Sequence, residues 1–160
     1  IQAAESGIKE AMEAGVLAGY TVVDIKATLY DGSYHEVDSS ELAFKMAGSL
    51  ALKEGVAKAK PILLEPIMKL EVVSPRQFLG DIVGDLTSRR AHIESIETTQ
   101  TEMCTIGSLI PLAETFGYTT SLRSLTQGRA THTIEFYRYQ ELPAELMAQV
   151  TQKTVGMKIG

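Results

Sequence analysis

The amino-acid sequence predicts an α/β protein of the α+β kind, made of two small sandwich bodies in which helices cover a sheet. Apolar positions repeat with a helical period in some stretches and alternate as in strands in others. A segment bounded by prolines, residues 61–66, separates two such series. Hydrophobic residues make up 44% of the 160 residues, which is enough to form packed cores.

The first body is predicted to contain a helix, a strand and a second helix. Helical spacing indicates a helix over residues 6–14, and alternation over residues 20–30 is typical of a half-buried strand. Asp38 and Glu41 have the spacing of a capping box, so a helix is expected from there to about residue 59. This helix carries two apolar lines, which favour burial against a sheet. The lines consist of Leu42, Met46 and Leu50, and of Phe44, Ala47 and Ala51.

The second body is predicted to run strand, helix, strand, strand, helix, strand. The expected elements are a strand over 67–73, a helix from a cap at 74–77 to residue 90, a hairpin of strands over 92–99 and 103–110 with Cys104, Ile106 and Ile110 inward, a helical segment from Pro111 to about Gly128, and a strand over 130–137. This order is the split βαβ of a ferredoxin-like βαββαβ domain. We expect bodies over 1–65 and 66–140, then a carboxy-terminal helix over 142–153 and a frayed tail, together filling 141–160.

No catalytic, metal or cofactor site is predicted within the chain. It contains neither GxxxxGK[ST] nor GxGxxG, and its three histidines are far apart and near no cysteine cluster. Ser33, His35 and Asp38 are too close together in one turn and helix cap to form a hydrolytic triad. Gly80 and Gly84 are expected in the middle of a helix, where small residues permit close packing. We therefore expect this chain not to be an enzyme.

The composition also indicates the cellular compartment in which the protein is expected. No apolar run approaches the roughly 20 residues that span a bilayer, so no membrane contact is expected. The single cysteine, Cys104, suits a reducing compartment, and we expect the cytoplasm. Because Ile1 is not preceded by an initiator Met or followed by a signal segment, we expect that the chain starts at an internal cut.

Two regions are candidates for nucleic-acid contact. The net charge is −5, but residues 116–139 carry three arginines against one glutamate, so a phosphate contact is expected there. The loop over residues 32–36 places Tyr34 and His35 at a turn, and such side chains can stack on unpaired bases. The same pattern also fits an ordinary solvated loop.

Longer stretches of sequence resemble the elongation factor G family of translational GTPases. In order they are the stretch Gly32-Ser33-Tyr34-His35-Glu36 continuing to Lys45, the stretch Leu64-Glu65-Pro66-Ile67-Met68, Gly84-Asp85-Leu86 with Arg89-Arg90, Phe116-Gly117-Tyr118, and Leu122-Arg123-Ser124 with Thr126-Gln127-Gly128-Arg129. The resemblance runs from about Gly7 to Tyr139. It implies that residues 1–65 are the later part of the fourth domain of the family, and that residues 66–140 are its ferredoxin-like fifth domain.

The resemblance also implies two sets of contacts. The set expected to contact tRNA, mRNA and the decoding region of the small ribosomal subunit is Ser33, Tyr34, His35 and Glu36. The set expected to contact phosphate, sugar and base edges of large-subunit ribosomal RNA is Arg123, Ser124 and Gln127.

The family resemblance implies that the intact factor is a monomer that uses GTP and Mg²⁺ to promote tRNA and mRNA translocation on the ribosome. Its nucleotide-binding part is expected to lie outside these 160 residues. The ribosome-recycling second form of the factor and a stand-alone ferredoxin-like RNA-binding module remain alternatives. The tetracycline-resistance protection proteins are less similar, because they lack a close version of residues 33–41.

Overall fold

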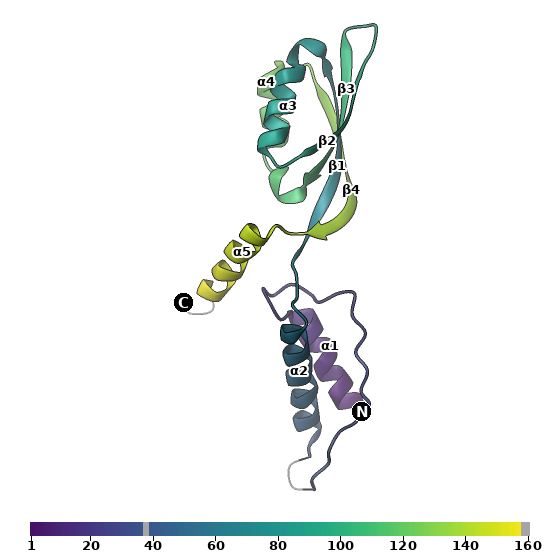
Figure 1. Cartoon of the computed structure of the whole chain (residues 1–160), viewed down its shortest axis with the longest axis vertical. Coiled ribbons are helices and arrows are strands. Elements are labelled where there is room, and N and C mark those ends of the chain that lie inside the picture. The colour runs from purple at the N-terminus through teal and green to yellow at the C-terminus, as the bar shows by residue number, and fades with distance from the viewer. Residues whose placement is uncertain (37–38, 158–160) are drawn as a thin grey trace. The chain divides into compact units, whose positions relative to one another are not determined.

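The computed structural model describes residues 1–36 and 39–157, and the chain divides into two units (Figure 1). Unit 1 comprises Ile1–Leu63 together with the chain from Pro143 onward, and unit 2 comprises Leu64–Leu142.

Unit 1 contains the helices α1 (Gln2–Ala14), α2 (Glu41–Lys58) and α5 (Ala144–Met157). The helix expected near the amino terminus is confirmed, and it ends where Gly15 turns to a φ of 76°. The expected carboxy-terminal helix is also present, but it continues through Met157, so the expectation of a frayed tail from residue 154 is wrong as far as residue 157. Residues 158–160 lie outside the described residues.

The strand predicted over residues 20–30 is wrong, because the structure describes no strand before residue 64. Over this segment the described residues show one main-chain hydrogen bond, from the Val22 N–H to the Met12 carbonyl at 2.8 Å. A strand exists only beside another strand, and the described part of unit 1 supplies helices alone. The alternating sequence therefore forms an unpaired segment in which Tyr30 is 93% exposed.

The second helix of unit 1 begins at Glu41, and Ser40 is its cap. The Ser40 hydroxyl oxygen accepts a hydrogen bond from the Ala43 N–H at 3.0 Å. The expected capping residue, Asp38, lies outside the described residues. Expected burial against a sheet is also wrong, because α2 packs on α1 through its one buried residue, Gly48. The predicted apolar line Leu42, Met46 and Leu50 is exposed.

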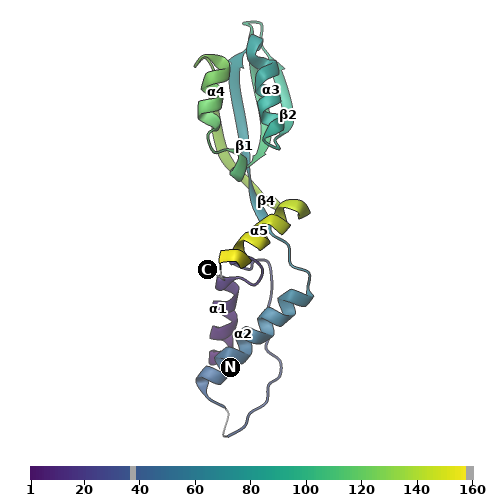
Figure 2. The same ribbon diagram turned by 90° about the vertical axis from the view of Figure 1, so that its left-hand side faces the viewer.

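Unit 2 has the predicted ferredoxin-like order. Its strands are β1 (Leu64–Pro75), β2 (His92–Thr98), β3 (Met103–Pro111) and β4 (Thr131–Glu141), and its α-helices are α3 (Leu79–Ser88) and α4 (Tyr118–Thr126). The sheet order is β2-β3-β1-β4, with every neighbouring pair antiparallel. Both helices lie side by side on one face of the sheet (Figures 1 and 2).

The core of unit 2 lies between this face of the sheet and the two helices. In β1 and β3 the residues that face the helices alternate with outward-facing ones, as period-2 geometry requires, and they meet one apolar stripe from each helix. The predicted inward residues Cys104, Ile106 and Ile110 are each 0% exposed, so this expectation is confirmed.

The starts of both helices differ from the predictions. Ser74 does not cap α3, because its hydroxyl is buried and donates to the Pro75 carbonyl at 3.2 Å. A single 3₁₀ turn over Arg76–Phe78 precedes α3. A second 3₁₀ turn over Leu112–Glu114 precedes α4, so the expected helix from Pro111 is divided and Phe116 lies in a loop.

The helix predicted to extend to residue 90 also ends earlier. It stops at Ser88, and Arg90 has a φ of 57°. A Cβ built on Gly80 or Gly84 meets no atom within 4 Å, so the expected close packing at these glycines is wrong.

Candidate nucleic-acid interface

The exposed side of α4 carries Arg123 and Ser124, and Gln127 follows directly. Tyr118, Leu122 and Thr126 line the opposite side and are buried. The structure therefore brings the three residues predicted to contact large-subunit RNA onto one exposed surface. The helix ends at Thr126, the following Gln127 adopts a left-handed conformation, and the Gly128 N–H donates to the Arg123 carbonyl at 2.9 Å.

The Arg123 guanidinium is available to an outside partner. Within residues 1–36 and 39–157 it makes no side-chain hydrogen bond or ion pair, and α4 contains no acidic residue. A guanidinium can donate two parallel hydrogen bonds to a phosphate, and no carboxylate on this helix competes for it.

The other two arginines of the basic stretch have aromatic neighbours. The Arg129 guanidinium lies 5.7 Å from the centre of the Phe78 ring. Arg138 lies 5.2 Å from the Tyr137 ring, and its Nη2 donates to Gln140 Oε1 at 3.3 Å. Arg123 differs from these two arginines in having no such partner among the described residues.

Sequence reasoning missed the role of Arg89, which connects α3 to the segment before α4. Its Nε donates to Asp85 Oδ2 at 3.0 Å, and its Nη1 donates to the carbonyl oxygens of Glu114 at 2.8 Å and Phe116 at 3.2 Å. Its Nη2 donates to the Ser121 hydroxyl at 2.8 Å. The side chain is 17% exposed, so these bonds form in a partly desolvated place.

Arg90 makes a second, separate connection. Its Nη1 and Nη2 donate to the two oxygens of Glu65 at 3.0 and 2.9 Å, and its Nε donates to Glu114 Oε1 at 3.2 Å. Hydrogen bonding to Glu65 raises the pKa of the Arg90 guanidinium, against the opposing effect of burial. The partners lie 24 and 25 residues away in the sequence, and no local pattern identifies them.

Two aromatic side chains at the start of α4, Phe116 and Tyr118, differ in their burial. Phe116 is 77% exposed, whereas Tyr118 is 1% exposed and its ring meets His132 edge-on at 5.5 Å. The Tyr118 hydroxyl is buried without a hydrogen-bond partner among the described residues. Burial raises the pKa of this phenol well above its ordinary value, and the nearby charge of Asp85 adds to the shift.

The four residues predicted to contact tRNA and mRNA lie in an exposed loop of unit 1. The His35 N–H donates to the Ser39 hydroxyl at 2.7 Å, and the Ser39 N–H donates to the His35 carbonyl at 2.9 Å. The Tyr34 ring is stacked on Phe44, with centroids 6.4 Å apart and planes 9° apart. The side chains of Ser33, His35 and Glu36 are exposed.

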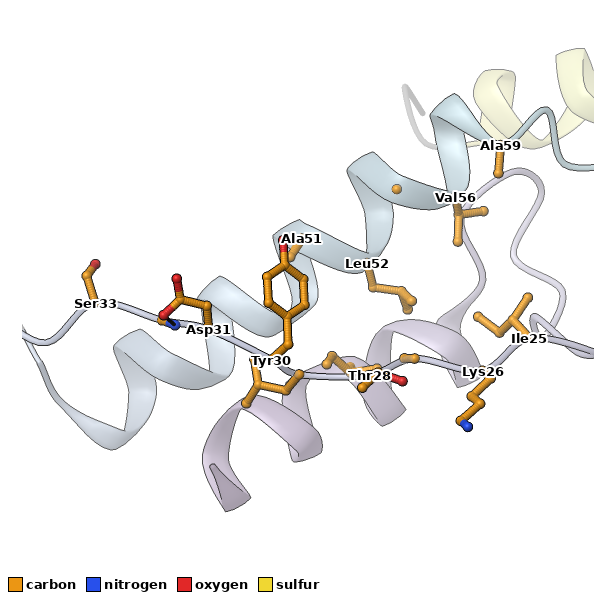
Figure 3. A pocket seen from close by; sticks show the side chains of 15 residues that line it. Ile25, Lys26, Thr28, Tyr30, Asp31, Ser33, Ala51, Leu52, Val56 and Ala59 are labelled. Carbon is orange, nitrogen blue, oxygen red and sulfur yellow. Dashed lines mark hydrogen bonds between the residues drawn. The ribbon is translucent and has the colours of Figure 1, made fainter.

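Unit 1 also contains an open groove of about 850 Å³ between residues 25–33 and α2 (Figure 3). Figure 3 shows Leu52 and Val56 of α2 on one side and Ile25 on the other. The charged residues among its lining are Lys26 and Asp31. No group of three His, Cys, Asp or Glu side chains gathers as a metal site in the part of the chain that the structure describes. No described helix is both long and apolar enough to cross a bilayer.

Comparisons with known proteins give matches over both units. Residues 1–60 match the family described as "Elongation factor G, domain IV", and residues 62–150 match "Elongation factor G C-terminus". Elongation factor G from two strains of Dehalococcoides mccartyi is 59% identical over 152 residues, which are 95% of this chain and 22% of each relative. A crystal structure of a Thermus thermophilus protein has a TM-score of 0.81 at 44% identity and matches 97% of this chain and 23% of that one. The chain thus spans about a fifth of the length of these relatives.

Proposed function

Because the chain belongs to the elongation factor G family, we propose that it is the ribosome-binding carboxy-terminal part of a translation elongation factor. In this proposal the intact factor uses GTP hydrolysis to promote tRNA and mRNA translocation. These 160 residues supply contacts with the ribosome, tRNA and mRNA. The observation that carries the proposal is the exposed Arg123 on a helix without acidic residues.

The surface of α4 is proposed to bind large-subunit ribosomal RNA. Arg123 would hold a phosphate, the Ser124 hydroxyl would bond a sugar or phosphate oxygen, and the Gln127 amide would bond a base edge. Their common exposure on one helix side and its end supports a joint contact. The buried stripe on the opposite side of α4 gives this surface a fixed support.

The loop with Ser33, Tyr34, His35 and Glu36 is proposed to contact tRNA, mRNA and the decoding region of the small subunit. The exposed imidazole and carboxylate can exchange hydrogen bonds with base edges and 2′-hydroxyls. One face of the Tyr34 ring lies against Phe44, and Tyr34 remains 67% exposed, so a base can stack on it. Replacing His35 by Ala in the intact factor should slow translocation and leave ribosome-stimulated GTP hydrolysis nearly unchanged. Equal loss of both rates would contradict this role.

No catalytic or cofactor-binding role is proposed for these residues. The sequence contains no phosphate-binding loop, so GTP and Mg²⁺ would be held by another part of the intact factor. Titration calorimetry with GTP and Mg²⁺ should therefore detect no saturable binding to the chain.

Competition on the ribosome tests the proposal as a whole. The chain should co-sediment with ribosomes and, in excess, inhibit translocation by intact elongation factor G. The double variant Arg123→Ala/Gln127→Ala should do both less well, while circular dichroism shows that it is folded. If the chain neither sediments with ribosomes nor competes, the proposed function is wrong.

A further inference from the structure

Phe116 is an exposed aromatic side chain on a fixed backbone. The Thr115 N–H donates to the Leu112 carbonyl at 3.1 Å, and the Tyr118 N–H donates to the Thr115 carbonyl at 3.0 Å. Arg89 donates to the carbonyl oxygen of Phe116 itself at 3.2 Å. The side chain is nevertheless 77% exposed. The loop therefore presents a phenyl ring to solvent at a defined place.

Arg89 fixes the loop to both helices of unit 2. Its contacts with Asp85 reach α3, and those with Ser121 reach α4. Its guanidinium also lies 5.3 Å from the centre of the buried Tyr118 ring. A loop held this way loses little freedom when a partner binds, so the position of Phe116 is preorganised.

The surroundings of Phe116 suit an anionic partner. Asp85 is paired with Arg89, whereas Glu114 shares Arg90 with Glu65, so the charge of each carboxylate is offset at least in part by an arginine. The exposed residues that follow on α4 are Thr119, Thr120, Arg123 and Ser124. These are hydroxyl side chains and a guanidinium, which are donors suited to a nucleic-acid backbone. A protein-binding hot spot would instead be expected within a wider apolar patch.

We propose that Phe116 is a stacking platform for an unpaired base of large-subunit ribosomal RNA, and that Arg89 is its positioning residue. This inference rests on the proposed function, because it extends the RNA contact of α4 to the loop before it. For a base to stack on an aromatic ring, the ring must have an accessible π-face, and a charged side chain is not needed. Phe116 supplies that face in the loop directly before α4, the helix that carries the exposed Arg123.

An affinity series on purified large ribosomal subunits tests the stacking. Phe116→Tyr and Phe116→Trp keep an aromatic face and should bind nearly as the unsubstituted chain does. Phe116→Leu keeps apolar bulk without a π-face, and it should bind about tenfold more weakly, as should Phe116→Ala. The slope of affinity against salt should stay the same, because no charge is removed. Wild-type affinity of both Phe116→Leu and Phe116→Ala would overturn the proposal.

The identity of the partner is tested by p-azidophenylalanine at position 116, irradiated on the same subunits. Crosslinks to ribosomal RNA are expected, and crosslinks to a ribosomal protein alone would overturn the proposal. The same group at position 139 is the control, because Tyr139 is a 62% exposed aromatic on β4. If Arg123→Glu weakens binding while every Phe116 variant binds normally, the stacking proposal fails and the proposed function stands. If neither change matters, both fail.

A double-mutant cycle tests the positioning role of Arg89. Arg89→Lys keeps the charge but cannot reproduce the several directed bonds of the guanidinium. It should weaken subunit binding in the wild-type chain and have no further effect in Phe116→Ala, provided that both variants are folded. Fully additive losses would show that Arg89 does not act through Phe116.

Discussion

Gly48 of α2 lies directly against the carbonyl oxygen of Ala4 in α1, and no Cβ fits between them. Gly7 of α1 meets the carbonyl oxygen of Lys45 in the same way. The two helices of unit 1 thus approach through their backbones at two glycines, rather than through the exposed leucines and methionine of α2. Side chains at these glycines would separate the helices.

Gly48→Ala is therefore expected to lower the free energy of unfolding of unit 1 by about 1–3 kcal/mol, because the added methyl group overlaps fixed main-chain atoms. Gly55→Ala is the matched control on the same helix, since its Cβ would meet no atom within 4 Å. That change should stabilise the helix by up to about 1 kcal/mol. Urea unfolding followed by circular dichroism measures both changes. Equal effects would contradict the backbone contact.

Arg89→Ala should lower the free energy of unfolding of unit 2 by roughly 2–4 kcal/mol, because it leaves Asp85 and the carbonyls of Glu114 and Phe116 without their donor in a partly buried place. Lys58→Ala is the control. It removes an exposed ion pair with Glu54, and it should leave stability almost unchanged. Denaturant unfolding measures the stability of both variants. Equal stability of the two would contradict a stabilising role for the hydrogen bonds of Arg89.

Tyr118→Phe should raise the free energy of unfolding by about 1 kcal/mol. The Tyr118 hydroxyl is buried and has no partner among the described residues, so removing it removes a desolvation cost. The ring keeps its edge contact with His132 and its contact with Arg89. A loss of stability in thermal unfolding would show that the hydroxyl has a stabilising partner.

The pH dependence of stability should be strongest in alkali. Burial raises the pKa of Cys104 above its usual 9.0, and that of Tyr118 above its usual 10.0. Both groups are neutral when protonated, so the folded chain holds these protons more tightly than the unfolded chain. Their contribution to the free energy of unfolding is complete below the usual pKa values, and it is lost as the pH rises from those values through the raised pKa values of the folded chain. Tyr118→Phe should reduce the decline above about pH 10, and an identical decline in both proteins would contradict this assignment.

The sequence predicted unit 2 far better than unit 1, and the reason is where the partners lie. In β3, alternation alone identifies the buried Cys104 and Ile106, because its neighbouring strands are present in unit 2. Residues 20–30 alternate equally well, yet they form no strand where the described residues offer none to pair with. A strand is a property of two segments, and periodicity describes only one.

Only part of the candidate site could be predicted from the sequence. The exposed side of α4 follows from helical spacing around the buried Leu122. The exposure of Phe116 does not, because the helix expected from Pro111 is interrupted and Gly117 adopts a φ of 72°. The contacts of Arg89 with residues 114 and 116 span 25 and 27 positions, and no local pattern reports contacts at that separation.

The central claim is that Arg123 binds a phosphate of large-subunit ribosomal RNA, and salt dependence tests it most directly. Affinity of the chain for purified large subunits is measured at several salt concentrations for the unsubstituted chain, Arg123→Glu and Lys69→Glu. Lys69 is the matched control, because it is exposed on β1 beside the inward-facing Leu70 and thus on the sheet face away from α3 and α4. Both variants change the net charge by the same amount.

Arg123→Glu should weaken binding about tenfold or more and reduce the slope of log affinity against log salt by about 1, since one phosphate contact fewer releases fewer counterions. Lys69→Glu should leave that slope nearly unchanged. An unchanged slope in a folded Arg123→Glu variant, or the same loss in both variants, would contradict the account.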